Sequence, residues 1–208
     1  MLGIIPSILA KTPEEFEQLV KKIEPHFQRA HIDIADGEFV PNKTICGYKE
    51  IMNLSTNLEL DVHLMVNQPI KDIHEWLKTK ASRIIAHVET NHVLKETSEI
   101  IKINNRQFGL AINPDSRTES LVEYLSDIDF VLFMTVVPGF YGSPLVEGVL
   151  GKIAAFHEEF PEVPIMVDGA MNPENVTRAM MAGATEFVVG SYIVSSDDMR
   201  KSIDSFNK

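Results

Sequence analysis

Two short motifs each place a histidine and an aspartate two residues apart in an apolar run. His31 and Asp33 form the first motif, and Asp61 and His63 form the second. Because side chains alternate between the two faces of a strand, the members of each pair lie on one face. A buried carboxylate is costly unless an ion pair or a metal ion compensates its charge. The first motif therefore predicts either a pair of metal ligands or a hydrogen-bonded structural pair. In the second motif, either Asp61 orients an imidazole by accepting a hydrogen bond from it, or His63 is a histidine satisfied within the core.

A third acidic residue, Asp168, closes the apolar run 165–167 and is followed by Gly169. This arrangement is typical of a carboxylate at the mouth of a barrel, and it is equally typical of a turn. If the strands that carry these residues end at one edge, four side chains meet there: His31, Asp33, His63 and Asp168. Mixed imidazole and carboxylate ligands suit Zn²⁺, Fe²⁺, Mn²⁺ or Co²⁺. Such an ion would act as a Lewis acid on a substrate oxygen.

Short segments rich in glycine follow three of the predicted strands and indicate a phosphate site. They are residues 139–142, 169–170 and 190–191. In barrels of alternating strands and helices, the loops after the last two strands often hold phosphate through backbone N–H groups. Glycine is also ordinary in tight turns, so no single one of these residues identifies the site.

Three further side chains at predicted strand ends have less specific interpretations. His87, followed by Glu89, is interpreted as a residue that supports either the site or the fold. Met65 and Met134 either line the mouth of the site or fill the core.

The chain that must position these residues alternates short apolar runs with amphipathic runs. Strands are predicted at residues 2–5, 29–34, 58–63, 83–87, 108–112, 130–134, 165–167 and 186–189. Helices are predicted from residue 12 and at 47–54, 70–79, 92–103, 119–125, 146–159, 173–182 and 197–206. Nearly continuous apolar strands suit a parallel sheet that is covered on both faces. Strict alternation of eight strands and eight helices predicts an α/β protein with one domain, a (β/α)₈ TIM barrel over residues 1–208. The alternative, an open doubly wound sheet, usually has a glycine-rich first turn, and residues 6–10 contain no glycine.

Composition excludes several classes of protein. The 208 residues carry a net charge of −11, which argues against binding to nucleic acid or to an anionic membrane surface. Cys46 is the only cysteine, so no disulfide forms within the chain, and a reducing, cytoplasmic location is expected. The apolar residues 1–10 lack a basic segment before them, and we expect a buried strand there rather than a signal peptide. No apolar run approaches the roughly 20 residues of a membrane span.

Together these residues resemble the ribulose-phosphate 3-epimerase family over nearly the whole chain. The segments that carry the resemblance are PSIL (6–9), HIDIADGEFVPN (31–42), DVHLM (61–65), NP (113–114), VPGFYG (137–142), VDG (167–169), NP (172–173) and GS (190–191).

The resemblance implies a fold, a reaction and a set of site residues. The fold is a (β/α)₈ barrel of the ribulose-phosphate-binding type. Each subunit would hold one divalent metal ion, with Zn²⁺ as the first choice, on His31, Asp33, His63 and Asp168. The reaction inverts C3 of a ketose phosphate, and Asp33 and Asp168 exchange protons on opposite faces through a cis-enediolate. The substrate would contact Ser7, His63, Gly139, Phe140, Tyr141, Gly142, Gly169, Ala170, Gly190 and Ser191. A homo-oligomer is also implied.

Three positions depart from the family pattern: Ala35, Tyr141 and Ala170 stand where the family usually has Met, Gly and Gly. Ala35 is expected to enlarge the pocket. Ala170 and residues 134–136 resemble the related allulose-6-phosphate 3-epimerases, which act on a longer sugar. Two alternatives to a pentulose phosphate epimerase therefore stay open: an epimerase of hexulose 6-phosphates, and a sugar-phosphate binder without catalysis.

Overall fold

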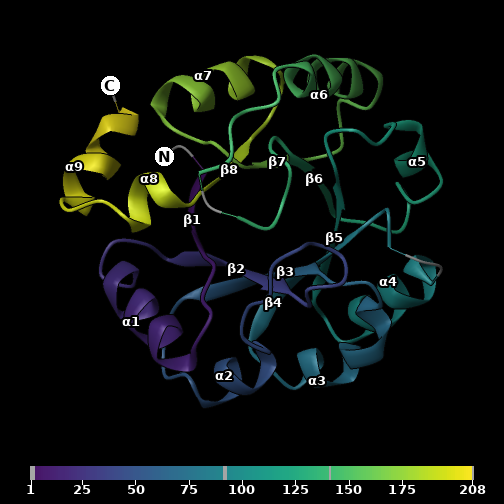
Figure 1. Ribbon diagram of the computed structural model, residues 1–208. Coiled ribbons are helices and arrows are strands. Elements are labelled where there is room, and N and C mark those ends of the chain that lie inside the picture. Colours follow the sequence, from purple (N-terminus) through teal and green to yellow (C-terminus); the bar gives the residue numbers. More distant parts are fainter. Residues whose placement is uncertain (1–2, 91–92, 141, 208) are drawn as a thin grey trace.

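A computed structural model describes residues 3–90, 93–140 and 142–207 of the protein. Its strands form a closed parallel barrel in chain order, and helices surround it (Figure 1). The strands are β1 (Gly3–Ile8), β2 (Arg29–Ala35), β3 (Glu59–Met65), β4 (Ala81–His87), β5 (Gln107–Ile112), β6 (Phe130–Met134), β7 (Ile165–Asp168) and β8 (Glu186–Val189). The predicted (β/α)₈ barrel is confirmed, and the open sheet is excluded.

The barrel closes where its first and last strands pair. Residues 3–6 of β1 lie beside 186–189 of β8, whereas Ser7 and Ile8 pair with β2. In Figure 1 the purple β1 accordingly lies next to the yellow-green β8. The sequence predicted that this strand ends at residue 5, but β1 continues through Ile8. Ser7 is therefore a strand residue, in register with His31 of β2.

Alternate residues of the strands face two different cores. Ile32 and Ile34 of β2 belong to the large core between the strands and the helices. A smaller cluster, which includes Ile85, Leu132 and Met166, fills the barrel itself. Because side chains alternate along a strand, His31 and Asp33 lie on the inner face. This arrangement agrees with the alternation predicted from the sequence.

The helices pack on the outside of the strands. They are α1 (Pro13–Ile23), α2 (Tyr48–Asn53), η1 (Pro69–Asp72, a 3₁₀-helix), α3 (Ile73–Leu77), α4 (Leu94–Ile103), α5 (Glu119–Val122), α6 (Gly148–Glu159), α7 (Pro173–Met181), α8 (Ser191–Val194), α9 (Met199–Asp204) and η2 (Ser205–Asn207, a 3₁₀-helix). Two begin with a capping side chain that is followed by a proline. Thr12 accepts a hydrogen bond from the N–H of Glu15, and Asn172 accepts one from Asn175.

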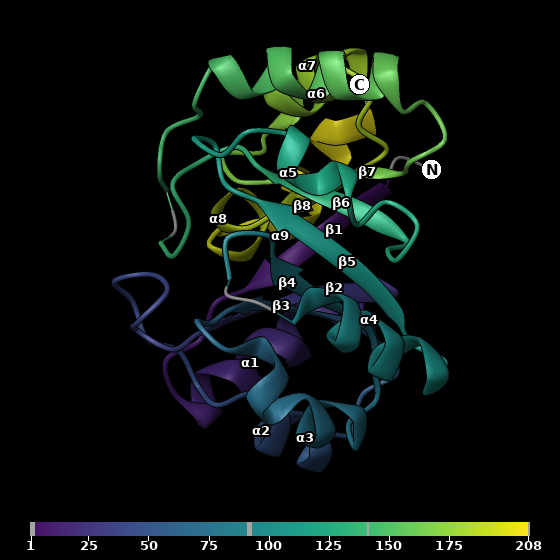
Figure 2. The ribbon, with the colours of Figure 1, turned by 90° about the vertical axis from the view of Figure 1, so that its right-hand side faces the viewer.

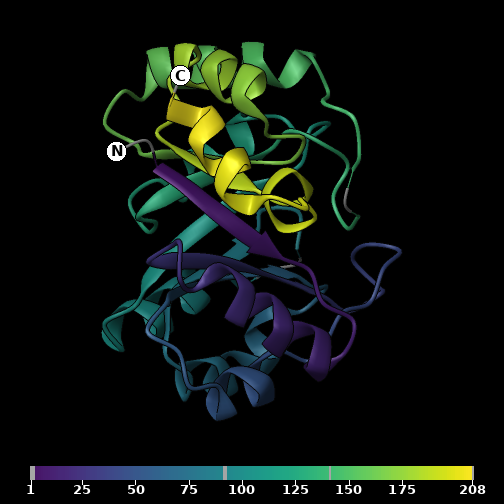
Figure 3. The same ribbon diagram turned by 90° about the vertical axis from the view of Figure 1, so that its left-hand side faces the viewer.

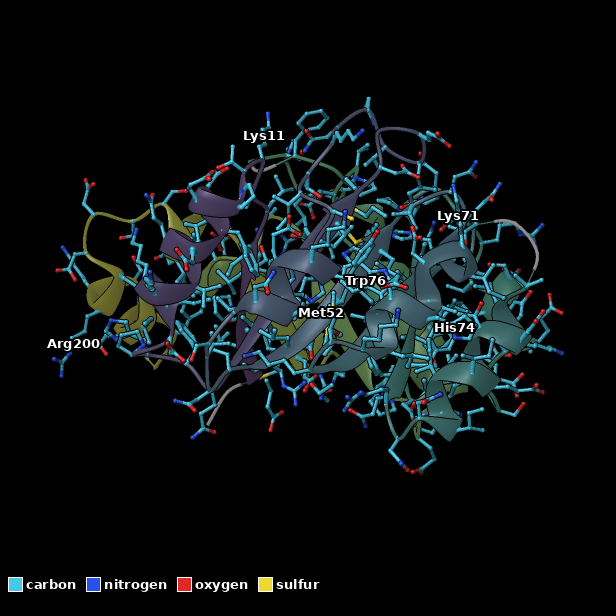
Figure 4. All side chains as sticks on the ribbon, turned by 90° about the horizontal axis from the view of Figure 1, so that it is seen from below. Lys11, Met52, Lys71, His74, Trp76 and Arg200 are labelled. Atoms are coloured by element: carbon cyan, nitrogen blue, oxygen red, sulfur yellow. The ribbon has the colours of Figure 1, made fainter. Side chains whose placement is uncertain are left out.

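Two predicted helices differ from the structure. Residues 70–79 form η1 and then the short α3, whose Trp76 is buried and whose His74 is exposed (Figure 4). After β8 there are two helices rather than one, because α8 ends at Val194 and the Asp198 side chain caps α9. The prediction of eight helices in strict alternation is therefore wrong in this C-terminal region. The predicted starts at residues 2 and 92 lie outside the described residues.

Charged side chains form a network at the amino-terminal end of the barrel. Asp61 is fully buried, accepts a hydrogen bond from Arg29, and lies 3.5 Å from the Arg83 guanidinium. Arg83 also makes hydrogen bonds of 2.6 and 3.0 Å to Glu186. The prediction that Asp61 orients an imidazole is wrong, because Arg29 and Arg83 bind its carboxylate. Among the described residues it has no hydrogen bond to an imidazole, although His31 is its register partner on β2. The amino-terminal end of such barrels generally serves stability.

Helices long enough and apolar enough to cross a lipid bilayer do not occur in the described part of the chain.

Candidate active site

Four predicted ligands meet at the carboxyl-terminal end of the barrel. His31 and Asp33 lie on β2, His63 on β3, and Asp168 is the last residue of β7. The register of β2 and β3 sets Asp33 opposite His63. One ligand atom from each of the four residues lies within 4.8 Å of those of the other three, and all four residues are buried. Such a cluster is compact enough to surround a single ion.

The shortest contacts in the cluster centre on one oxygen. Asp33 Oδ1 lies 3.0 Å from His63 Nδ1 and 3.5 Å from His31 Nε2. Asp168 Oδ2 lies 3.8 Å from His63 Nδ1 and 3.9 Å from His31 Nε2. Both carboxylates therefore lie against both imidazoles.

The two carboxyl groups differ in proton affinity. Burial, together with the charge of Asp33, raises the pKa of Asp168 to about 7. Burial also disfavours the charged form of Asp33, but the neighbouring His31 and His63 rings outweigh it and hold the pKa of Asp33 below its usual range. A pair of carboxyls whose environments separate their pKa values is suited to act as a base and an acid.

The histidines fit a metal ion. Neither ring nitrogen of the fully buried His31 has a hydrogen-bond partner among the described residues, which is costly unless another group compensates. Burial lowers the pKa of His63 to about 4, so its ring is neutral at physiological pH, as a metal ligand must be. Two imidazoles and two carboxylates form a donor set that Zn²⁺ and similar ions accept.

A cavity of about 470 Å³ opens directly above the cluster. Asp33 and Asp168 line it, together with most of the predicted substrate contacts: Ser7, Gly139, Phe140, Gly142, Gly169, Ala170, Gly190 and Ser191. His63 lies beneath this lining and reaches the site through its contact with Asp33. Tyr141 lies outside the described residues.

Other residues that line the cavity were missed by the sequence analysis. They are Leu9, Val136, Pro138, Ser143, Pro144, Leu145, Met171, Asn172, Asn175 and Tyr192. Asn172 was recognised only in the NP segment (172–173) that carries the family resemblance, although its position two residues beyond Ala170 was a usable signal. Met65 and Met134 line the cavity, which favours the first of their two interpretations.

Ala35 does not itself line this cavity. It is buried in a small cluster with Val40 and Met65, against which Phe39 packs, and it is absent from the described lining. The expectation that Ala35 enlarges the pocket in place of the larger Met stays a prediction.

Two loops meet over the site. Residues 36–44 follow β2, and residues 135–140 and 142–147 follow β6; these segments project from the same end of the barrel (Figures 2 and 3). The Asn42 side chain donates a hydrogen bond of 2.5 Å to the carbonyl oxygen of Gly139. Asp36 organises the first loop by accepting hydrogen bonds from the backbone of Glu38, Phe39 and Asn67. The second loop, which contains part of the glycine-rich segment, is thus held against the first.

The turn after β7 requires its glycine. Gly169 has φ +115°, and a Cβ added there would lie 2.5 Å from the Val136 side chain. Gly169→Ala is therefore expected to lower the free energy of unfolding by about 2–5 kcal/mol, through backbone strain and overpacking. Gly151→Ala is the matched control, since Gly151 lies within α6 with open space around it, and it should raise stability by about 0.5–1 kcal/mol. Chemical denaturation of both variants measures the two effects, and equal effects would contradict the expectation.

Comparison with known proteins agrees with this geometry. The ribulose-phosphate 3 epimerase family model matches residues 3–194. The chain is 34% identical over 210 residues to the ribulose-phosphate 3-epimerase of Bacillus subtilis (strain 168), covering 98% of this chain and 97% of that protein. It is 31% identical over 208 residues to the Escherichia coli (strain K12) protein of the same name, covering 97% and 92%.

Among solved structures, a 3-hexulose-6-phosphate synthase superposes with a TM-score of 0.69 and 14% identity, over 99% of this chain and 98% of that one. At this identity the likeness concerns the fold alone. The family model and the curated relatives, in contrast, cover nearly the whole chain at the level of sequence. The chain belongs to the ribulose-phosphate 3-epimerase family.

Proposed function

We propose that this protein is a metal-dependent epimerase that interconverts D-ribulose 5-phosphate and D-xylulose 5-phosphate. The observation that carries the proposal is the meeting of two carboxylates, Asp33 and Asp168, with two imidazoles below a cavity of about 470 Å³. Inversion of a carbon that bears an acidic proton needs a proton acceptor on one face and a proton donor on the other. The separated pKa values of the two aspartates suit these roles.

The two aspartates carry out the proton transfers in this proposal. Asp33, whose pKa is lowered, takes the C3 proton of the bound ketose and leaves a cis-enediolate. Asp168, whose pKa is raised to about 7, delivers a proton to the opposite face of C3. In the reverse direction the two residues exchange roles. Met65 and Met134 line the cavity with apolar surface, which limits the access of water to the intermediate.

The residues proposed to hold one divalent ion are His31, Asp33, His63 and Asp168. When bound, the ion would supply Lewis-acid stabilisation of the negative charge on the substrate oxygens and would offset the repulsion between the carboxylates. Zn²⁺ is the first candidate, and Fe²⁺, Mn²⁺ and Co²⁺ suit the same donor set.

The phosphate group is proposed to bind at the other end of the cavity. Its lining there comes from the turns after β6, β7 and β8: Gly139, Gly142, Gly169, Ala170, Gly190 and Ser191. The described lining contains no lysine or arginine. Backbone N–H groups of these turns would therefore bind the anion, which is compatible with the net charge of −11.

An epimerisation assay on the purified protein, paired with metal analysis, tests this function. We expect turnover of D-ribulose 5-phosphate and about one divalent ion per chain. A metal-free protein that binds the sugar phosphate without epimerising it would instead support the alternative of a binder without catalysis.

The choice between pentulose and hexulose phosphates requires a comparison of substrates. Ala170, one of the positions that resemble the hexulose-phosphate enzymes, does line the cavity. We expect kcat/KM for D-ribulose 5-phosphate to exceed that for D-allulose 6-phosphate by about 10–200-fold, the discrimination typical of one added group. The reverse order, measured side by side on one preparation, would reassign the substrate.

The remaining expectations concern location and assembly. We propose a cytoplasmic location on the basis of the lone Cys46. A relative that is 34% identical is named as the cytoplasmic isoform in Oryza sativa subsp. japonica. The homo-oligomer implied by the family resemblance stays a prediction, which light scattering of the purified protein tests.

A further inference from the structure

Two residues behind the proposed metal site are linked to its ligand His63 but take no part in the proposed chemistry, one by direct contact and the other through the first. They are His87, the last residue of β4, and Glu89, which follows it. We infer that His87 and Glu89 are positioning residues, which hold the proton of His63 on Nε2 and so keep Nδ1 free to bind the metal ion. This inference rests on the metal site proposed above.

A chain of hydrogen bonds links the three side chains. His63 Nε2 lies 2.8 Å from His87 Nε2, and His87 Nδ1 lies 3.1 Å from Glu89 Oε2. The His63 and His87 ring planes differ by 20°, with centroids 5.0 Å apart. Since the nearest nitrogens are much closer than the centroids, the rings meet edge to edge, as an N–H···N hydrogen bond requires.

The direction of these hydrogen bonds follows from counting protons. An ionised carboxylate only accepts, so His87 donates from Nδ1 to Glu89. A neutral imidazole carries one proton, so His87 Nε2 must accept. His63 therefore donates from Nε2, and its Nδ1 keeps a lone pair. That nitrogen lies 3.0 Å from Asp33 Oδ1 and 3.8 Å from Asp168 Oδ2, at the proposed metal position.

Glu89 and His87 are themselves held in place. Glu89 Oε1 accepts a hydrogen bond of 2.8 Å from the backbone N–H of Asn113, which follows β5. The ring of Phe39, in the loop after β2, packs against His87 with centroids 4.7 Å apart. His87 is fully buried. Contacts from two neighbouring segments thus fix the orientations of the Glu89 carboxylate and the His87 ring, on which the direction of the hydrogen bonds depends.

Glu89→Gln is the sharpest test, because it keeps the shape of the side chain but leaves one acceptor oxygen where the carboxylate has two. The amide NH₂ must then face either Asn113 N–H or His87 Nδ1–H. The first arrangement disrupts the anchor, and the second reverses the chain of hydrogen bonds and moves the His63 proton to Nδ1. We expect the Zn²⁺ dissociation constant, measured by competition with a chromogenic chelator at fixed pH, to rise about 10–100-fold.

The matched control is Glu119→Gln, which removes an exposed carboxylate paired with Arg117 and should leave Zn²⁺ affinity unchanged. Unaltered affinity in Glu89→Gln, with normal affinity in the wild type, overturns the inference and leaves the metal site standing. A wild-type protein that does not bind Zn²⁺ overturns both.

Substitution of His87 separates positioning from mere packing. His87→Gln retains an acceptor and a donor on neighbouring atoms, whereas His87→Leu retains neither. We expect His87→Gln to bind Zn²⁺ more tightly than His87→Leu. The difference in affinity should exceed what the difference between the two variants in free energy of unfolding explains. The ¹⁵N NMR spectrum of the Zn²⁺-loaded wild type should show His63 protonated at Nε2, and protonation at Nδ1 would overturn the inference. Equal affinities of the two variants would count against it as well.

Discussion

The double substitution of Asp33 and Asp168 by asparagine is expected to abolish exchange of the substrate C3 proton with solvent deuterium. Asparagine keeps the size of each side chain but has no carboxylate to accept a proton. The loss of a general acid or base costs about 10²–10⁴ in rate, and the double variant loses both. NMR of D-ribulose 5-phosphate in D₂O, at equal enzyme concentrations, measures the exchange directly.

Each single variant should lose inversion while retaining exchange on one face. One carboxylate remains in each, and it still removes the proton from the epimer whose C3–H faces it. One variant should therefore exchange the C3 proton of ribulose 5-phosphate, and the other variant that of xylulose 5-phosphate. Neither variant should interconvert the two sugars at the wild-type rate. This complementary pattern distinguishes two bases on opposite faces from a single base that serves both.

Asp204→Asn, on the exposed side of α9, is the control and should behave as the wild type. The metal content of each variant must be determined, since both aspartates are also proposed ligands. Exchange at the wild-type rate in the double variant would rule out the two-carboxylate mechanism.

Zn²⁺ is expected to raise the melting temperature of the wild-type protein, and His31→Gln should remove most of that rise. A ligand present at 1,000 times its dissociation constant stabilises the folded state by about 4 kcal/mol. For a chain of this size, that corresponds to about 8–16 °C. A four-ligand zinc site contributes about 10–16 kcal/mol, so the loss of one ligand should weaken binding by about 10²–10³-fold. The same Zn²⁺ concentration then gives His31→Gln little or no shift.

The control for this experiment is His74→Gln, since His74 is an exposed histidine on α3 (Figure 4). Thermal unfolding with Zn²⁺, and again after addition of a chelator, measures the shift and its reversal. A Zn²⁺-dependent shift in His31→Gln as large as in the wild type would place the ion elsewhere.

The shared face of His31 and Asp33 on β2 was predictable for a local reason. Alternation along a strand is set by backbone geometry, so His31 and Asp33 share a face in any strand that contains both. The capped, proline-started helices α1 and α7 were predictable for the same reason, because a cap involves only residues within one turn.

The predictions that were wrong concern residues whose partners are distant in the chain. Asp61 does share a face with His63, but Arg29 and Arg83 bind its carboxylate. The sequence around Asp61 does not indicate that arginines from two neighbouring strands contact it. Likewise, β1 extends through Ile8 because β2 supplies a new neighbour where pairing with β8 ends. The partner of a side chain such as Asp61, and the residue at which a strand such as β1 ends, depend on which strands lie next to it in the barrel.

The sequence by itself determined the alternating elements, the face on which each candidate ligand lies, and the family to which the motifs point. Only the tertiary structure decided that Asp168 comes within 4 Å of His31 and His63, more than 100 residues away. It also decided that His87 and Glu89 lie behind His63. The physical reason is that closure of the barrel sets distances between strands, and closure results from the packing of all eight strands rather than from any one of them.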